Sequence, residues 1–61
     1  MRITANIIRD VVNGKDAVMC VKIADTLRAN GFTYNRTFRM VSNLTGISAA
    51  DWDELLQEGD K

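Results

Sequence analysis

The sequence predicts an all-α fold, a compact bundle of about four short helices within one domain spanning residues 1–61. Apolar residues recur at intervals of three and four, which is the period of an amphipathic helix. Glycines at positions 14, 31 and 46 separate the periodic stretches, and proline is absent. Apolar residues make up 46% of the chain and charged residues 26%. This balance is typical of a globular domain, although a chain of this length can build only one modest core.

The first helix is predicted over residues 4–13, with Thr4 as its N-cap and Asn13-Gly14 as its end. One face gathers the apolar side chains of Ala5, Ile7, Ile8, Val11 and Val12. A strand over residues 2–8 is the alternative, because isoleucine favours strands. The strict alternation of a strand breaks at Ile7-Ile8, which favours the helix.

The second helix is predicted over residues 16–30, with Asp16 as N-cap and Gly31 in the left-handed conformation that closes a helix. Its apolar arc consists of Met19, Cys20, Ile23, Ala24 and Leu27. Cys20 is the only cysteine and the chain contains no histidine. An internal disulfide is therefore impossible, and a zinc site would lack its usual ligands. We expect Cys20 to be a buried structural thiol.

The third helix is predicted over residues 34–45, capped by Thr33, and the fourth over residues 48–58, capped by Ser48. An inward stripe in the third consists of Tyr34, Phe38, Val41 and Leu44, and one in the fourth of Trp52, Leu55 and Leu56. The large side chains expected to fill the core are those of Trp52, Phe32, Phe38 and Tyr34. Gly59 is expected to end the fourth helix.

The apolar stretches are too short to predict membrane insertion. The longest, residues 17–21, falls far short of the roughly 20 residues that a membrane span needs. The first residues contain no apolar segment of signal-peptide length. These features predict a cytoplasmic protein that does not enter a membrane. Homodimer formation is a further expectation, because a small core without disulfide or metal is commonly stabilised by oligomerisation.

The net charge of zero hides two oppositely charged halves. Residues 1–39 carry seven basic and three acidic side chains, a net charge of +4, and residues 40–61 carry one basic and five acidic, a net charge of −4. Such asymmetry can indicate a basic surface for nucleic acid beside an acidic segment. The alternative is that the acidic residues merely suit the helix dipole and the other charges are solvated.

The polar face of the third helix is the leading candidate site. Arginine and asparagine can pair bidentately with guanine and adenine in the major groove. The candidate base-contacting residues are Asn35, Arg36, Arg39 and Asn43, and Arg28 and Lys22 are expected to contact phosphate. Residues 23–38, a helix, a glycine turn and a second helix, resemble a helix-turn-helix, which implies that the second helix enters the groove of double-stranded DNA. The resulting hypothesis is a DNA-binding transcriptional regulator.

The acidic fourth helix supports an alternative hypothesis. Residues 41–52 also form a glycine-centred turn, but the helix that follows would repel phosphate. Its exposed acidic residues are Asp51, Asp53, Glu54 and Glu58. These could dock on a basic protein, as in an adaptor or inhibitor, and a purely structural oligomerisation module also stays open. We expect no cofactor and no enzymatic activity, because the sequence lacks histidine and phosphate-binding glycine loops.

Overall fold

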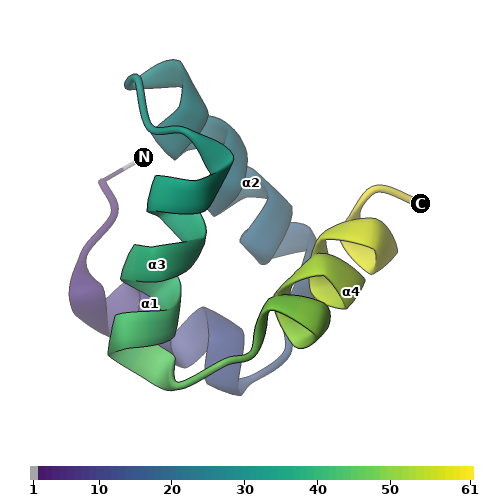
Figure 1. Cartoon of the computed structure of the whole chain (residues 1–61). Helices are drawn as coiled ribbons and strands as arrows, with labels where there is room; N and C mark the ends of the chain where they lie inside the picture. The colour runs from purple at the N-terminus through teal and green to yellow at the C-terminus, as the bar shows by residue number, and fades with distance from the viewer. Residues whose placement is uncertain (1) are drawn as a thin grey trace.

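A computed structural model describes residues 2–61 and confirms the all-α bundle (Figure 1). Its four helices are α1 (Ala5–Asn13), α2 (Ala17–Ala29), α3 (Tyr34–Thr45) and α4 (Ala49–Gly59). Each end lies within one residue of its predicted position. Residues 5–8 belong to α1, so the alternative of a first strand is wrong. None of these helices is both long and apolar enough to cross a membrane.

Each helix begins at its predicted N-cap. The side-chain oxygens of Thr4, Asp16, Thr33 and Ser48 accept hydrogen bonds from backbone N–H groups three residues later, at distances of 3.1–3.2 Å. Each bond satisfies one of the N–H groups that the first turn of a helix leaves without a partner. The starts of all four helices are therefore encoded locally.

The turns between the helices depend on left-handed backbone conformations. Gly31 and Gly46 have φ angles of 92° and 77°, as a glycine after a helix permits. At the end of α1 the left-handed residue is Lys15, with a φ angle of 53°, and Gly14 is right-handed. The turn of residues 30–33 joins α2 to α3 in the predicted helix-turn-helix-like order.

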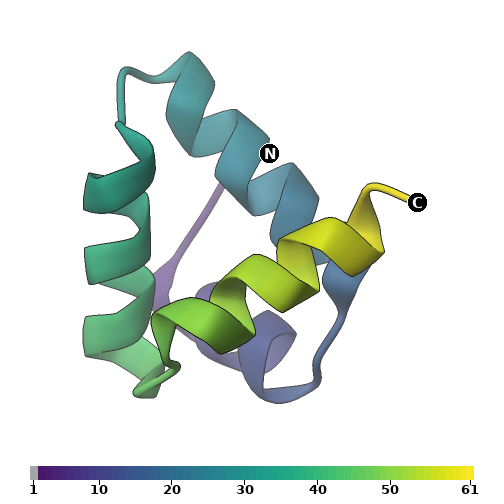
Figure 2. The same ribbon diagram turned by 45° about the vertical axis from the view of Figure 1, so that its right-hand side comes forward.

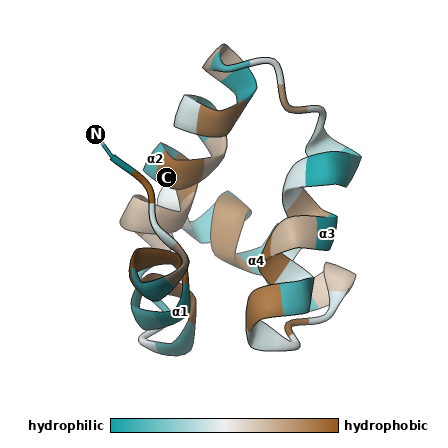
Figure 3. Ribbon diagram, turned by 90° about the vertical axis from the view of Figure 1, so that its left-hand side faces the viewer, coloured by the Kyte–Doolittle hydropathy of each residue, from teal (hydrophilic) through white to brown (hydrophobic). Residues whose placement is uncertain are grey.

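The core lies between two helix pairs, with α2 packing mainly on α4 and α1 mainly on α3. Figure 2 shows α4 against the first half of α2, and Figure 3 shows hydrophobic segments facing one another between the helices. The largest fully buried side chains are those of Trp52, Ile23, Val41 and Cys20. The burial predicted for Trp52 and Cys20 is confirmed.

The helices α2 and α4 approach closely at Gly59. A Cβ atom added to Gly59 would lie 2.3 Å from the backbone oxygen of Ala17 and 2.5 Å from Cγ2 of Val21. Gly59 is the last residue of α4, where the sequence predicts a helix end. Its position in the structure adds a second reason for glycine, because no larger residue fits against α2 without displacing backbone.

Tyr34 corrects the predicted inward stripe of α3. Its side chain is 49% exposed, whereas Thr37 is only 4% exposed. The buried arc of α3 is centred on Thr37 and Val41, with Phe38 and Leu44 half-buried at its edges. Tyr34 lies on the flank toward α4, where its hydroxyl donates a hydrogen bond to Asp53. A phenol that finds a polar partner at the surface need not be buried.

Candidate nucleic-acid interface

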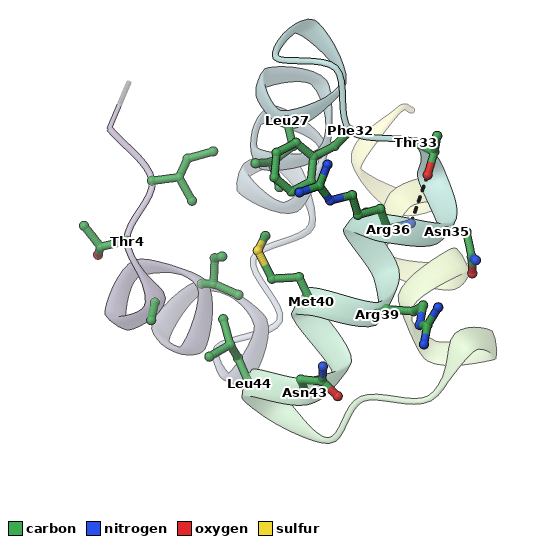
Figure 4. A pocket seen from close by; sticks show the side chains of 13 residues that line it. Thr4, Leu27, Phe32, Thr33, Asn35, Arg36, Arg39, Met40, Asn43 and Leu44 are labelled. Atoms are coloured by element: carbon green, nitrogen blue, oxygen red, sulfur yellow. Dashed lines mark hydrogen bonds between the residues drawn. The ribbon is translucent and has the colours of Figure 1, made fainter.

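The four candidate base-contacting residues lie together on one arc of α3. Asn35, Arg36, Arg39 and Asn43, hereafter the α3 arc, are all exposed. Residues three and four apart are neighbours on a helix surface, so this spacing places them side by side. All four line one open groove of about 840 Å³ between α1 and α3 (Figure 4). The helix period thus gathers them as the sequence predicts.

The floor of this groove is apolar and comes from five segments of the chain between residues 3 and 44. The segment before α1, α1 itself, the end of α2, the turn after it and α3 all contribute. The apolar lining residues are Ile3, Ala5, Ile8, Leu27, Phe32, Met40 and Leu44. Figure 4 shows Phe32, Met40 and Leu44 pointing into the hollow from the same side as Arg36. The α3 arc is therefore one rim of an apolar groove, and not an isolated polar face.

Arg36 is held in place at the edge of the groove. Its guanidinium carbon lies 4.3 Å from the centroid of the Phe32 ring. The ring attracts the cation, an interaction worth about 0.5–1 kcal/mol at an exposed site. The backbone N–H of Arg36 also donates a hydrogen bond to the hydroxyl of Thr33, at 3.1 Å. Both contacts restrict the position of this arginine.

The lining of the groove has a positive electrostatic character. Within the described residues its charged members are Arg36 and Arg39, and none is acidic. No neighbouring carboxylate in the lining therefore competes with a ligand for these two guanidinium groups. The guanidinium group of arginine can form two parallel hydrogen bonds with a phosphate, with a carboxylate or with the edge of guanine.

The two residues expected to contact phosphate are not part of this groove. Lys22 and Arg28 are exposed on α2, but neither lines the groove. Leu27, the buried neighbour of Arg28, is the residue of α2 that reaches the lining. The structure therefore brings together four of the six candidates and leaves two on the surface of another helix.

The acidic residues of α4 divide into two sites. Asp51, Glu54 and Glu58 line a second hollow of about 420 Å³ that also contains Lys15. Asp53 instead accepts the hydrogen bond from Tyr34. This bond, together with partial burial and the negative charge of the carboxylate, raises the pKa of Tyr34 above its ordinary value. The two hollows share no lining residue.

Sequence reasoning missed the apolar side of the groove. Phe32 was expected in the core; it is half-buried and packs against the core, but it also lines the groove and contacts the Arg36 guanidinium. Met40 lies next to the α3 arc on the helix surface and is only half-buried. A methionine at the boundary between the polar and apolar faces of a helix is only a weak signal of a binding surface. Methionines at such positions also cover the edges of ordinary cores.

The thiol of Cys20 lies outside both hollows. Cys20 has no exposed surface, and burial followed by the charge of Asp16 raises the pKa of its thiol from 9.0 to about 11. A thiol with a raised pKa is a poor nucleophile near neutral pH. Residues 2–61 contain no group of three potential metal-ligating side chains.

Comparison with known proteins adds no relative. No protein-family model, curated protein sequence or solved structure matches this chain.

Proposed function

We propose that the chain is a small cytoplasmic DNA-binding protein, a transcriptional regulator that presents α3 to the major groove of double-stranded DNA. The observation that supports this function best is the α3 arc, two arginines and two asparagines exposed on one helix face without a carboxylate beside them in the groove lining. These two residue types are the ones that pair bidentately with guanine and adenine.

The spacing of the α3 arc suits successive base pairs. Asn35, Arg39 and Asn43 follow one another at intervals of four residues, and each interval advances about 6 Å along a helix axis. Base pairs are stacked about 3.4 Å apart, so neighbouring side chains of the row reach different base pairs. A homodimer would double the site and read two half-sites.

The charge separation is compatible with this role in spite of a net charge of zero. The acidic residues of α4 line a hollow that shares no residue with the groove. Lys22 and Arg28 remain available on α2 to contact phosphates that flank α3.

Salt-dependent binding to labelled duplex DNA tests this function. We expect fluorescence anisotropy to show binding at low salt that weakens steeply as salt rises. The double variant Arg36→Ala and Arg39→Ala should bind less tightly and reduce the salt slope by about one for each phosphate contact it removes. Arg9→Ala is the matched control, because Arg9 is exposed on α1 outside the groove. No binding of the unmodified chain to mixed-sequence duplex DNA at low salt would overturn the proposal.

A protein-binding function through α4 is the second candidate. The observation that favours it is the common hollow lined by Asp51, Glu54 and Glu58. In this function the chain is an adaptor or inhibitor that docks on a basic protein surface. Charge reversal with Glu54→Lys and Glu58→Lys should then abolish partner capture in a pull-down from the native cell, with nuclease present to remove bridging DNA. Asp53→Lys is the comparison variant, since Asp53 lies outside this hollow. Capture that survives the Glu54 and Glu58 changes would exclude the second hollow as the docking site.

A further inference from the structure

The apolar floor of the groove is unexplained by DNA binding alone. Duplex DNA presents mostly polar base edges in its major groove, and its apolar feature there is the methyl group of thymine. The floor contains large side chains from five segments of the chain, among them Ile8, Phe32 and Met40. A straight duplex that contacts the α3 arc would leave this concave surface uncovered.

We propose that the groove between α1 and α3 binds an amphipathic helix of another protein, one with an apolar stripe flanked by acidic residues. The two walls of the groove are helices, and a helix lays its apolar face into such a groove through residues at positions i, i+3, i+4 and i+7. The groove volume of about 840 Å³ accommodates several side chains of this stripe. Met40 lies in the lining, and the flexible thioether of methionine adapts to different apolar partners.

The charge of the groove determines the charge of its partner. Arg36 and Arg39 stand at its rim, and no acidic residue of the described chain lines it. Phe32 holds the Arg36 guanidinium at 4.3 Å, so this group is positioned before a ligand arrives. A helix with glutamate or aspartate beside its apolar stripe can pair with both arginines, whereas lysine at the same places would be repelled.

A second copy of this chain does not have the required helix. The exposed face of α4 is acidic, but its large apolar residues Trp52 and Leu55 are buried. Within the described residues the exposed large hydrophobic side chains are Val18 on α2 and Tyr34 on α3. Neither helix combines an exposed apolar stripe with acidic flanks. Two grooves facing each other would bring like-charged arginines together. The partner is therefore a different protein.

This interaction would compete with DNA because both ligands use Arg36 and Arg39. An acidic helix in the groove would neutralise the guanidinium groups and block the approach of phosphates to the α3 arc. The competition rests on the proposed DNA binding, but the docking of the helix does not. The chain would then be a regulator whose access to DNA is controlled by an acidic partner.

The test uses two synthetic helical peptides that differ only in charge. Both have leucine at i, i+3, i+4 and i+7, and one has glutamate and the other lysine on the flanking positions. Calorimetry with the full chain should show saturable binding of the glutamate peptide and at least about tenfold weaker binding of the lysine peptide. Equal affinity for both peptides, or no binding of either, would overturn the proposal.

Variants of the floor and a direct map of the contacts locate the site. Met40→Glu should abolish peptide binding, and Arg9→Ala should leave it unchanged. If Met40→Glu fails to fold by circular dichroism, Met40→Ala takes its place and should weaken binding several-fold. Nuclear magnetic resonance of the unmodified chain should show peptide-induced shifts at Ile3, Ile8, Met40 and Leu44. Shifts confined to α4 would rule out the groove as the docking site.

The DNA and peptide experiments fail independently. If the chain binds the glutamate peptide in the groove but binds no duplex, the docking proposal stands and the proposed DNA-binding function is wrong. If the chain binds duplex but not the peptide, the proposed DNA-binding function stands and the docking proposal is wrong. If both bind, the glutamate peptide should displace labelled duplex, and simultaneous binding would disprove the competition.

Discussion

The hydroxyl of Tyr34 on α3 donates a hydrogen bond to the carboxylate of Asp53 on α4, across 19 positions of sequence. It joins the helix that carries the α3 arc to the helix that carries the acidic surface. The bond favours the neutral phenol, which is why the pKa of Tyr34 is raised above 10.0. The contribution to stability is therefore present below the ordinary pKa of a tyrosine and is lost as the pH rises through the raised value.

Replacement of Asp53 should return the titration of Tyr34 toward normal. Tyr34 is the only tyrosine, so the ultraviolet absorbance of tyrosinate reports this group alone. We expect Asp53→Ala to lower its apparent pKa, because the acceptor and the negative charge are both removed. Glu54→Ala is the control and should leave the titration nearly unchanged. An identical titration in Asp53→Ala and the unmodified chain would show that the bond does not form in solution.

Trp52 should be essential for folding. Its side chain is fully buried, and removal of a buried tryptophan side chain costs about 3–5 kcal/mol. That loss is comparable with the whole stability of a small domain, at roughly 0.1 kcal/mol per residue. Trp52→Ala should therefore abolish the cooperative thermal transition measured by circular dichroism. An unchanged melting temperature would contradict the central place of Trp52 in the core.

The indole of Trp52 gives this position a second, subtler property. Its Nε1 group is buried and has no hydrogen-bond partner within residues 2–61. An unpartnered buried donor costs about 1–3 kcal/mol, so the replacement of tryptophan by phenylalanine removes a penalty while it removes volume. We expect Trp52→Phe to fold and to be much more stable than Trp52→Ala, as measured by denaturant unfolding. Phenylalanine and alanine both lack the unpaired donor, so equal stabilities of the two variants would mean that the volume of the aromatic ring is of no consequence.

Gly59→Ala should destabilise the chain although alanine is the better helix former. Its methyl group would overlap the backbone of Ala17 and the side chain of Val21. Overpacking of this kind costs about 1–3 kcal/mol, more than the roughly 1 kcal/mol that helix propensity returns. Gln57→Ala on the exposed face of α4 is the control. A Gly59→Ala variant as stable as that control would show that α2 and α4 separate easily.

Cys20 should resist thiol reagents until the chain unfolds. It is fully buried, and its pKa of about 11 leaves little thiolate near neutral pH. We expect labelling at pH 8 to be far slower in buffer than in denaturant and to accelerate in destabilised variants such as Gly59→Ala. Fast labelling of the native chain would show that α2 opens locally. The unfolded thiol ionises first as pH rises above 9.0, so this thiol also weakens the fold in alkali.

Local signals in the sequence were sufficient for the helices, and distant contacts were not predictable. Thr4, Asp16, Thr33 and Ser48 cap helices through bonds over three residues, so the sequence near each start contains the whole signal. The orientation of the Tyr34 side chain depends on α4, which follows α3 in the sequence and supplies Asp53 as the hydrogen-bond acceptor. The apolar period of α3 alone predicts that Tyr34 faces inward. This period contains no information about the position of α4, the helix that supplies the partner of the Tyr34 hydroxyl.

The candidate site follows the same division. The α3 arc was predictable because its four members share one helix and its period. The apolar floor opposite was not, because Ile3, Leu27 and Met40 meet only when α1, α2 and α3 are packed. Charge patterning likewise located the acidic residues of α4, but not the separation of Asp53 from the other three.

The groove exists only in the folded chain, since its lining comes from segments between residues 3 and 44 that unfolding would scatter. A molecule that binds the groove but not the unfolded chain must therefore raise the melting temperature, by an amount that grows with the logarithm of the ratio of its free concentration to its Kd. Thermal stability is then a readout of occupancy that needs no label and no knowledge of the ligand. A chain with so small a core would show this effect clearly, because modest binding free energy is a large fraction of its total stability.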